Sequence, residues 1–497
     1  MRRLPLLLLA ALVGAAAASS AQEAPAAANV PATARALSLP EALELADKAS
    51  ESVRVAEAEV KRAEAQKRQA RSERFPQLDA SSSYTRTLHS EFEDVDLDFG
   101  GGEGDSSSLS DLPFGQRNQY RLGLVVNQSL WSGGRITART RAASAAVDAT
   151  WAGLAAARAE LRLTVTQAYF DALLLDRLVD ISEQTLAQAD RAFEQTKLAH
   201  QVGNQSEFEL LRAQVSRDNV RPALVQRRAD RDLSYARLAQ LLDLPPNEPL
   251  QLTTSFADFA TWDAQGTVPA VADRATWLAK VIDDRVPVRQ ATAAVAVQEQ
   301  QVKIAHAERL PSVGASSDYG RVAYPAGGLP EWGDTRTNWT VGLGLRVPLL
   351  TGGRLAAQEG AARATLDEAR ARLDQTREAA WLDARDALDR LAAAEAVFQA
   401  AFGTIAQAQR AYEIAELRYR EGLSTQLELN DTRIQLTFAQ GNAALAARNL
   451  QVARARVALL PDLPLGAGAG TTLTAASAGV SAPTPTAPAA SVTPVGF

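Results

Sequence analysis

Leu130-Trp-Ser-Gly-Gly-Arg135 recurs later in the chain as Leu349-Leu-Thr-Gly-Gly-Arg354, at an offset of 219 residues. Upstream of each copy, Arg74-Phe-Pro-Gln-Leu-Asp-Ala80 is matched by Arg309-Leu-Pro-Ser-Val-Gly-Ala315 at an offset of 235, so the first copy holds 16 additional residues between the two landmarks. A repeated succession of motifs indicates duplicated structural units. The sequence therefore predicts two tandem repeats, each too extended to bury its own apolar surface, that pack side by side.

Each repeat is expected to contain two β-strands. Pro76 and Pro311 each end a helix and open an extended segment. In the next extended segment apolar residues alternate with polar or small ones, over 120–130 in the first repeat and 339–349 in the second. Alternation over about 10 residues with one polar face is typical of a membrane-spanning strand. A lone segment of this kind also fits a half-buried soluble hairpin, but two matching hairpins that lead into long helices favour the membrane.

Long helices are predicted directly after the two Gly-Gly turns. Gly133-Gly134 and Gly352-Gly353 are followed by segments without proline, 135–201 and 354–421. A helix of this length extends about 100 Å. In both segments apolar residues, many of them alanine, recur with alternating spacings of four and three, which predicts that these helices coil around neighbouring helices.

Both long helices are expected to end in a hairpin tip. Gly203 and Gly422 each supply the glycine that commonly terminates a helix. A capping box follows each glycine, Ser206-Glu-Phe-Glu209 in the first repeat and Thr425-Gln-Leu-Glu428 in the second. These boxes predict return helices that run antiparallel to the long ones.

The flanking segments have compositions of their own. Arg2-Arg3, an apolar run and a small-residue cleavage site predict a secretory signal peptide, and a tail of Ala, Thr, Ser, Gly and Pro predicts disorder. In chain order we expect a signal peptide (1–21), a flexible N-terminus (22–38), repeat 1 (39–242, with strands at about 76–88 and 118–130, a long helix 135–201 and a return helix 206–242), a linker (243–286), repeat 2 (287–460, with strands at about 311–323 and 337–349, a long helix 354–421 and a return helix 425–460) and a disordered tail (461–497).

These features together resemble the TolC-like outer-membrane factor (outer membrane efflux protein) family, over about Leu39 to Leu460. The resemblance implies an α+β membrane channel: a homotrimeric 12-stranded β-barrel with four strands per chain, continued by a long α-helical coiled-coil barrel and built from two tandem repeats. It implies a protein of the outer membrane that contacts lipid and extends into the periplasm. Its partners would be a periplasmic adaptor protein and an inner-membrane pump or ABC ATPase, as in tripartite efflux and type I secretion.

The same resemblance implies roles for residues of the tips. The acids of the family's periplasmic gate map onto Glu428 and Asp431, although Glu428 is also the capping residue of its helix and Asp431 also fits a solvated helix face. The hydrogen bond that locks the family's tips maps onto Tyr419 and Glu209. The adaptor would contact the tip turns at Gly203, Gly422 and Leu423. Ser424 stands where the family often has a basic residue, and Arg418 or Arg420 would have to replace it.

Enzymatic and nucleic-acid functions are not expected. The three histidines, His89, His200 and His306, fall on different predicted elements, and the sequence contains none of the common catalytic motifs. We therefore expect no catalytic residues, no cofactor and no metal site. Asp94-Val-Asp96-Leu-Asp98 resembles the start of a calcium loop but has Phe99 where glycine is needed. A net charge of −6 argues against a nucleic-acid partner, and the absence of cysteine excludes disulfides.

An alternative from a different functional class stays open on sequence grounds. A periplasmic coiled-coil adaptor or structural protein that never enters the membrane would explain the signal peptide and the heptads. It would not explain two alternating hairpins with aromatic residues near the strand ends.

Overall fold

The computed structural model describes residues 35–89, 118–245, 248–254, 274–325, 330 and 335–466. The predicted signal peptide, most of the acidic loop and the tail beyond 466 lie outside these residues. The strands are β1 (Arg35–Leu37), β2 (Gln77–Arg86), β3 (Asn118–Trp131), β4 (Leu250–Leu252), β5 (Ser312–Ala323) and β6 (Thr335–Arg346). The helices are α1 (Leu39–Ala49), α2 (Glu51–Ser72), α3 (Arg135–Gln201), α4 (Glu207–Asp218), α5 (Val220–Leu241), α6 (Arg274–Asp284), α7 (Val286–Ala307), α8 (Arg354–Arg420) and α9 (Gln426–Leu459).

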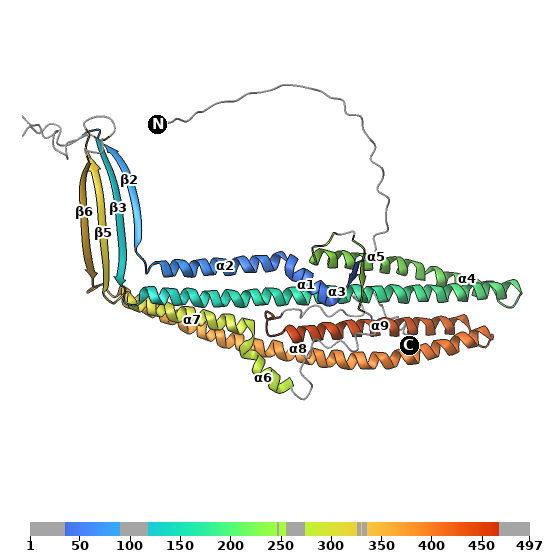
Figure 1. Cartoon of the computed structure of the whole chain (residues 1–497). Coiled ribbons are helices and arrows are strands. Elements are labelled where there is room, and N and C mark those ends of the chain that lie inside the picture. Colours follow the sequence, from blue (N-terminus) through green and yellow to red (C-terminus); the bar gives the residue numbers. More distant parts are fainter. Residues whose placement is uncertain are drawn as a thin grey trace, which may run out of the picture.

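The molecule is a long helical bundle with a sheet at one end (Figure 1). The two repeats lie side by side, and α3 and α8 contain 67 residues each, which corresponds to about 100 Å of helix. Both helices start beside the sheet and end at the opposite end of the bundle, where each turns back into its return helix (Figure 1). None of the described helices has both the length and the hydropathy of a membrane span.

Four antiparallel strands form the sheet in the order β2-β3-β5-β6, so the central β3–β5 pairing joins the two repeats. Residues directly opposite one another in this register share a face of the sheet. One face gathers the apolar residues, including Leu78, Leu122, Leu124, Tyr319, Trp339, Val341, Leu343 and Leu345. The other face carries most of the polar ones, including Asp79, Arg121, Asp318, Asn338 and Arg346.

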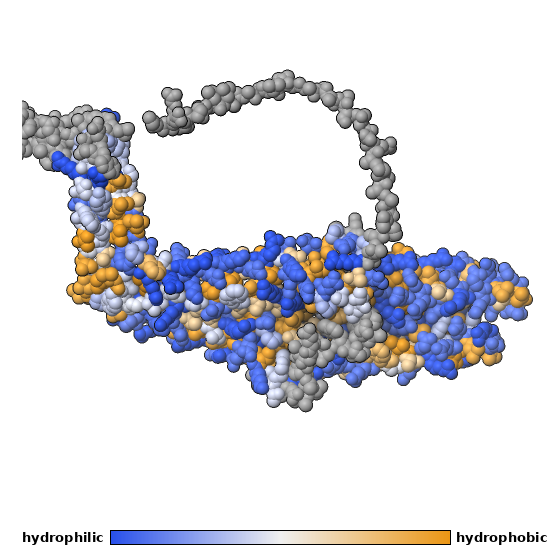
Figure 2. Space-filling view, in the orientation of Figure 1, coloured by the Kyte–Doolittle hydropathy of each residue, from blue (hydrophilic) through white to orange (hydrophobic). Residues whose placement is uncertain are grey.

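The apolar face of the sheet is uncovered by the rest of the chain. On β6, Trp339 is 70% exposed and Leu343 is 75% exposed. Figure 2 shows hydrophobic residues gathered on the sheet, whereas the helical bundle presents a mainly hydrophilic surface. Strands β2 and β6 are each paired on one side only, so both edges of the sheet keep backbone groups without a strand partner.

The helices pack through the apolar positions that the 4-3 spacing predicts. On α8, Ala380, Ala384, Ala387 and Leu391 are at most 2% exposed. Around the middle of α3, Tyr169 and Phe170 anchor the largest cluster, together with residues of α1, α2 and α5. The Tyr169 hydroxyl donates to the backbone oxygen of Leu37 at 3.1 Å and so ties β1 to the bundle.

Some helices are more divided than we expected. The first return segment consists of α4 and α5 because Pro222 has no N–H to continue the hydrogen-bond ladder across Asn219. The helix expected before Pro76, from about Leu39 to Arg74, breaks at Ser50, whose extended backbone separates α1 from α2. Strand β6 stops at Arg346, earlier than the predicted 349, since Pro348 lacks the N–H that a strand pairing uses.

Three segments predicted as flexible or as linker are partly ordered. Residues 35–37, expected in a flexible N-terminus, form β1, which pairs in parallel with β4 of the expected linker. The same linker contains α6, and Leu278 of α6 is buried against α8 and α9. The start of the predicted disordered tail is also packed, because Leu463 is 1% exposed.

A buried charge cluster fixes this last segment. Asp383 on α8 pairs with Arg285 at 2.7 Å and with Arg456 at 2.9 Å, and both arginines are at most 5% exposed. Burial lowers the pKa of Arg285, whereas Asp383 opposes that shift. Arg285 also donates to the backbone oxygen of Leu463 at 3.4 Å. The cluster therefore connects the entry to α7, the middle of α8 and the end of α9.

We predict that Asp383→Ala destabilises the protein by about 3–5 kcal/mol, because it leaves the buried Arg285 without its carboxylate and Arg456 with only the longer 3.5 Å contact to Asp386. Asp389→Ala is the matched control on the same helix, since the Asp389–Arg385 pair is 62% and 56% exposed. It should change stability by at most about 1 kcal/mol. Thermal unfolding of the detergent-solubilised variants, followed by circular dichroism, measures both. Equal shifts in the two variants would contradict this role for Asp383.

Candidate functional site

The predicted site residues gather at the two hairpin tips, at the end of the bundle farthest from the sheet (Figure 1). One tip joins α3 to α4 and the other joins α8 to α9. Gly203 has φ +82° and Gly422 has φ +73°, the left-handed conformation that a helix-ending turn requires. The backbone N–H groups of Asn204 and Leu423 then donate back to Ala199 and Arg418, at 2.8 and 2.7 Å.

Each return helix starts at a capped residue. The Ser206 hydroxyl accepts from the Glu209 N–H at 3.3 Å, and the Thr425 hydroxyl accepts from the Glu428 N–H at 3.4 Å. These contacts satisfy N–H groups that the first turn of a helix otherwise leaves without a partner. The two tips are thus built alike, as the capping boxes predict.

The tips are joined through a contact that differs from the predicted lock. The hydroxyl of Tyr419 lies 2.7 Å from the hydroxyl of Thr196 on α3, so the structure pairs Tyr419 with Thr196 in place of Glu209. Glu209 instead faces Gln426: with that amide oriented to suit its neighbours, its nitrogen donates to the Glu209 carboxylate at 3.2 Å. Both contacts cross from one repeat to the other, so the lock residues do lie at the junction of the two hairpins.

The two predicted gate acids differ in their surroundings. The Glu428 carboxylate forms an ion pair with Arg418 at 2.9 Å, and the two side chains are 40% and 49% exposed. Arg418 therefore supplies the basic partner that Ser424 cannot. Asp431 lies three residues later on the same side of α9 and is exposed to solvent. The structure leaves the gating role of both acids as a prediction.

Large apolar side chains are exposed at the tips. Val202 is 64% exposed and Phe208 68% on the first tip, and Leu423 is 70% exposed on the second. Figure 2 shows hydrophobic colour at the end of the bundle where these turns lie. Exposed apolar groups that cluster at one end of a hydrophilic rod are typical of a protein–protein contact.

The four glycines of the strand-to-helix turns lie at the other end of the bundle. Gly133, Gly134, Gly352 and Gly353 all have positive φ, and Gly134 and Gly353 are the N-cap residues of α3 and α8. At Gly133 a Cβ atom would lie 2.9 Å from Cβ of Leu310, so the turn also requires close approach to the end of α7. These glycines set the direction in which each long helix leaves the sheet.

Sequence analysis missed Thr196, although a signal for it exists. Thr196 continues the 4-3 series on α3 after the buried Ala189 and the half-buried Phe193, and it is 1% exposed. A hydroxyl in a series otherwise occupied by apolar residues indicates a specific polar partner across the helix interface. Its partner, Tyr419, is 223 residues away and is not identified by the spacing.

Metal-ligating side chains are dispersed over the described ranges. No group of three or more His, Cys, Asp or Glu side chains there is arranged to hold a metal ion. The aspartates that resemble a calcium loop lie outside the described residues.

The sequence matches the model of a known family. The family described as Outer membrane efflux protein matches residues 42–243 and 277–460. Nodulation protein T of Rhizobium leguminosarum bv. trifolii is 25% identical over 316 residues, which span 62% of this chain and 64% of that protein. The pyoverdine export outer membrane protein OpmQ of Pseudomonas putida is 25% identical over 56% of this chain and 57% of that protein. The matches thus span less than two thirds of the length of these relatives.

Solved structures share the fold. The outer membrane protein VceC of Vibrio cholerae superposes with a TM-score of 0.66 at 22% identity, over 85% of this chain and 96% of that one. The open state of the MtrE outer membrane channel of Neisseria gonorrhoeae gives a TM-score of 0.68 at 20% identity, over 86% and 89%. The predicted combination of long helices, a four-stranded sheet and two tandem repeats is confirmed.

We predict opposite effects for glycine substitutions at and away from the tip. Gly422→Ala forces a Cβ into the left-handed region, which costs about 1–2 kcal/mol. Gly403 lies within α8, and a Cβ atom there would meet no other atom within 4 Å. Gly403→Ala should therefore stabilise that helix by about 0.5–1 kcal/mol, because alanine loses less backbone entropy than glycine on helix formation. Hydrogen–deuterium exchange should therefore speed up at the α8–α9 tip in the first variant and slow down near residue 403 in the second. Slower exchange at the tip of Gly422→Ala would contradict the assigned turn.

Proposed function

The chain belongs to the outer membrane efflux protein family, and from this premise we propose that it is the outer-membrane channel subunit of a tripartite efflux or type I secretion system. The protein is located in the outer membrane, extends into the periplasm and is not an enzyme, as the sequence predicted. Substrates would pass from an inner-membrane pump through the helical part and leave through the sheet. Because the chain belongs to the outer membrane efflux protein family, the alternative of a periplasmic adaptor that never enters the membrane is no longer supported.

The uncovered apolar face of the sheet is the observation that carries the proposal. A strand such as β6, with Trp339 and Leu343 exposed on one face and Asn338 and Arg346 on the other, suits lipid on one side and water on the other. Edge strands β2 and β6 keep open backbone groups, which are costly in lipid. Chains must therefore associate edge to edge.

The association that we propose is a homotrimer. Channels of this family are trimeric and coupled to efflux systems. Three sheets that pair β2 of one chain with β6 of the next would close a single barrel of 12 strands. The helical bundles of the three chains would continue the conduit on the periplasmic side, about 100 Å from the sheet to the tips.

The tips are the proposed contact with the rest of the system. Val202, Phe208 and Leu423 expose apolar surface at the turns around Gly203 and Gly422, which suits a periplasmic adaptor protein. The adaptor would link the channel to an inner-membrane pump or an ABC ATPase. In this arrangement the Tyr419–Thr196 contact resists separation of the two hairpins, and adaptor binding would have to loosen it.

Glu428 and Asp431 are the proposed periplasmic gate. Three copies of each carboxylate around the axis of a trimer would attract cations and narrow the opening. The Arg418–Glu428 pair holds one of these acids against the tip within its own chain. Opening would then move the acids apart together with α9.

The first experiment tests the channel itself. Protein extracted in detergent should have the mass of a trimer by light scattering and give discrete conductance steps in a planar lipid bilayer. A monodisperse protein that needs no detergent and conducts nothing would contradict the proposal and restore the adaptor hypothesis.

The second experiment tests the gate. In the double variant Glu428→Gln/Asp431→Asn, glutamine preserves the capping box while both charges are removed. Single-channel conductance should rise, and block by divalent or trivalent cations should weaken, because the cation-attracting ring is lost. Glu421→Gln is the control, since Glu421 is a tip carboxylate 60% exposed and paired with Arg420. Conductance and block equal to the control would refute the gate and leave the channel standing.

A further inference from the structure

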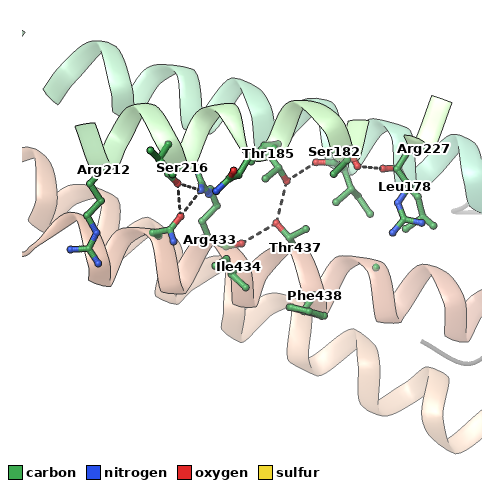
Figure 3. A pocket seen from close by; sticks show the side chains of 17 residues that line it. Leu178, Ser182, Thr185, Arg212, Ser216, Arg227, Arg433, Ile434, Thr437 and Phe438 are labelled. Atoms are coloured by element: carbon green, nitrogen blue, oxygen red, sulfur yellow. Dashed lines mark hydrogen bonds between the residues drawn. The ribbon is translucent and has the colours of Figure 1, made fainter. Parts of the chain in front are cut away.

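A groove lies between the two hairpins, on the side of the tips that faces the sheet. It is bounded by α3, by α4 and α5 of the first repeat and by α9 of the second, and its volume is about 520 Å³ (Figure 3). Leu178 and Ile181 line it from α3, and Ile434 and Phe438 from α9. Its walls are therefore apolar over much of their area.

Arg433 of α9 is buried in this groove. The residue is 7% exposed, and it occupies a position between Leu429 and Leu436 at which the 4-3 spacing calls for an apolar side chain. Its Nη2 atom donates to the Ser216 hydroxyl at 2.8 Å and to the side-chain oxygen of Asn430 (Figure 3). Both acceptors are neutral.

The charge of Arg433 is not balanced by a carboxylate. Within the part of the chain that the structure describes, no ion pair reaches Arg433, and its buried Nε atom has no hydrogen-bond partner. Burial lowers the pKa of the guanidinium group. A buried cation without a counter-charge is unfavourable, and a carboxylate that reached it would recover charge-assisted hydrogen bonds.

The rest of the groove is also positive. Arg212 lines it towards the tips and Arg227 lines it towards the sheet, whereas no aspartate or glutamate is among the lining residues. The groove therefore combines a buried guanidinium, two further arginines and apolar walls. This combination selects a negative group that is attached to an apolar body.

We propose that the groove binds an amphipathic organic anion, with its carboxylate on Arg433 and its hydrocarbon chain along Ile434 and Phe438. Such a ligand would touch α4 and α9 at once, since Ser216 and Asn430 already form a hydrogen bond across these helices at 2.9 Å. By mass action it stabilises the arrangement of hairpins in which the groove exists. The site is separate from the tip residues and does not depend on the gate assignment.

The test uses the full chain in an uncharged detergent and laurate labelled with ¹³C at the carboxyl carbon. The wild-type protein should give a bound carboxyl resonance, distinct from that of laurate in micelles. Arg433→Gln should weaken laurate binding about tenfold or more, because it removes the buried charge-assisted contact. Dodecyltrimethylammonium, which has the same chain length and the opposite charge, should not displace the bound laurate.

Arg221→Gln is the matched control. Arg221 carries the same charge on α5 but is 57% exposed, pairs with Asp218 and does not line the groove. This variant should bind laurate like the wild type. Circular dichroism and mass by light scattering establish that each variant is folded and assembled, and Arg212→Gln, which leaves Arg433 in place, should lose less affinity than Arg433→Gln.

Several outcomes would overturn the proposal. Equal laurate binding in Arg433→Gln and Arg221→Gln would place the carboxylate elsewhere. Displacement by inorganic phosphate at the same concentration as laurate would show that the apolar walls contribute nothing. Failure of the assembled wild-type protein to bind laurate would refute the groove as a site for an amphipathic carboxylate.

Discussion

The close approach of helices that are rich in alanine is the constraint on which the rest of the structure depends. Most of the stability of a helix in a protein comes from packing of its apolar side. Helix α3 packs against its return helices α4 and α5 and against α7 and α9 of the other repeat, whereas α8 packs mainly against α7 and α9 of its own repeat. Ala380 and Ala384 are fully buried on α8, and their small side chains allow neighbouring backbones to lie near one another. The spacing between helices, and with it the position of both tips, follows from these residues.

Features that depend on local period were predictable from the sequence, and features that depend on distant partners were not. Alternation in β6 and 4-3 spacing in α8 are written into consecutive residues, so the fold class could be derived from them. The order of residues 35–37 depends on pairing with β4 more than 200 residues away, and the order of Leu463 depends on Arg285. The tip acids could be located by resemblance, but the partner of Tyr419 could not.

Polar residues at buried positions of the helix interface occur where the two hairpins meet. Thr196 and Arg433 both replace apolar residues in the 4-3 series, at 1% and 7% exposure. A buried polar contact contributes less to stability than well-packed apolar residues would, but it discriminates between alternative registers of the helices. Two hairpins held by such contacts have one preferred arrangement that a binding partner can still change.

The sheet exposes its apolar residues whereas the helical bundle buries them, and the Gly-Gly turns connect these two parts of the molecule. In the sheet the apolar residues lie on a face that the rest of the chain leaves uncovered, whereas in the bundle they pack against other helices. Left-handed glycines at 133 and 134, and again at 352 and 353, form the same turn in both repeats, although the return segments and the strands that flank them differ in length and division.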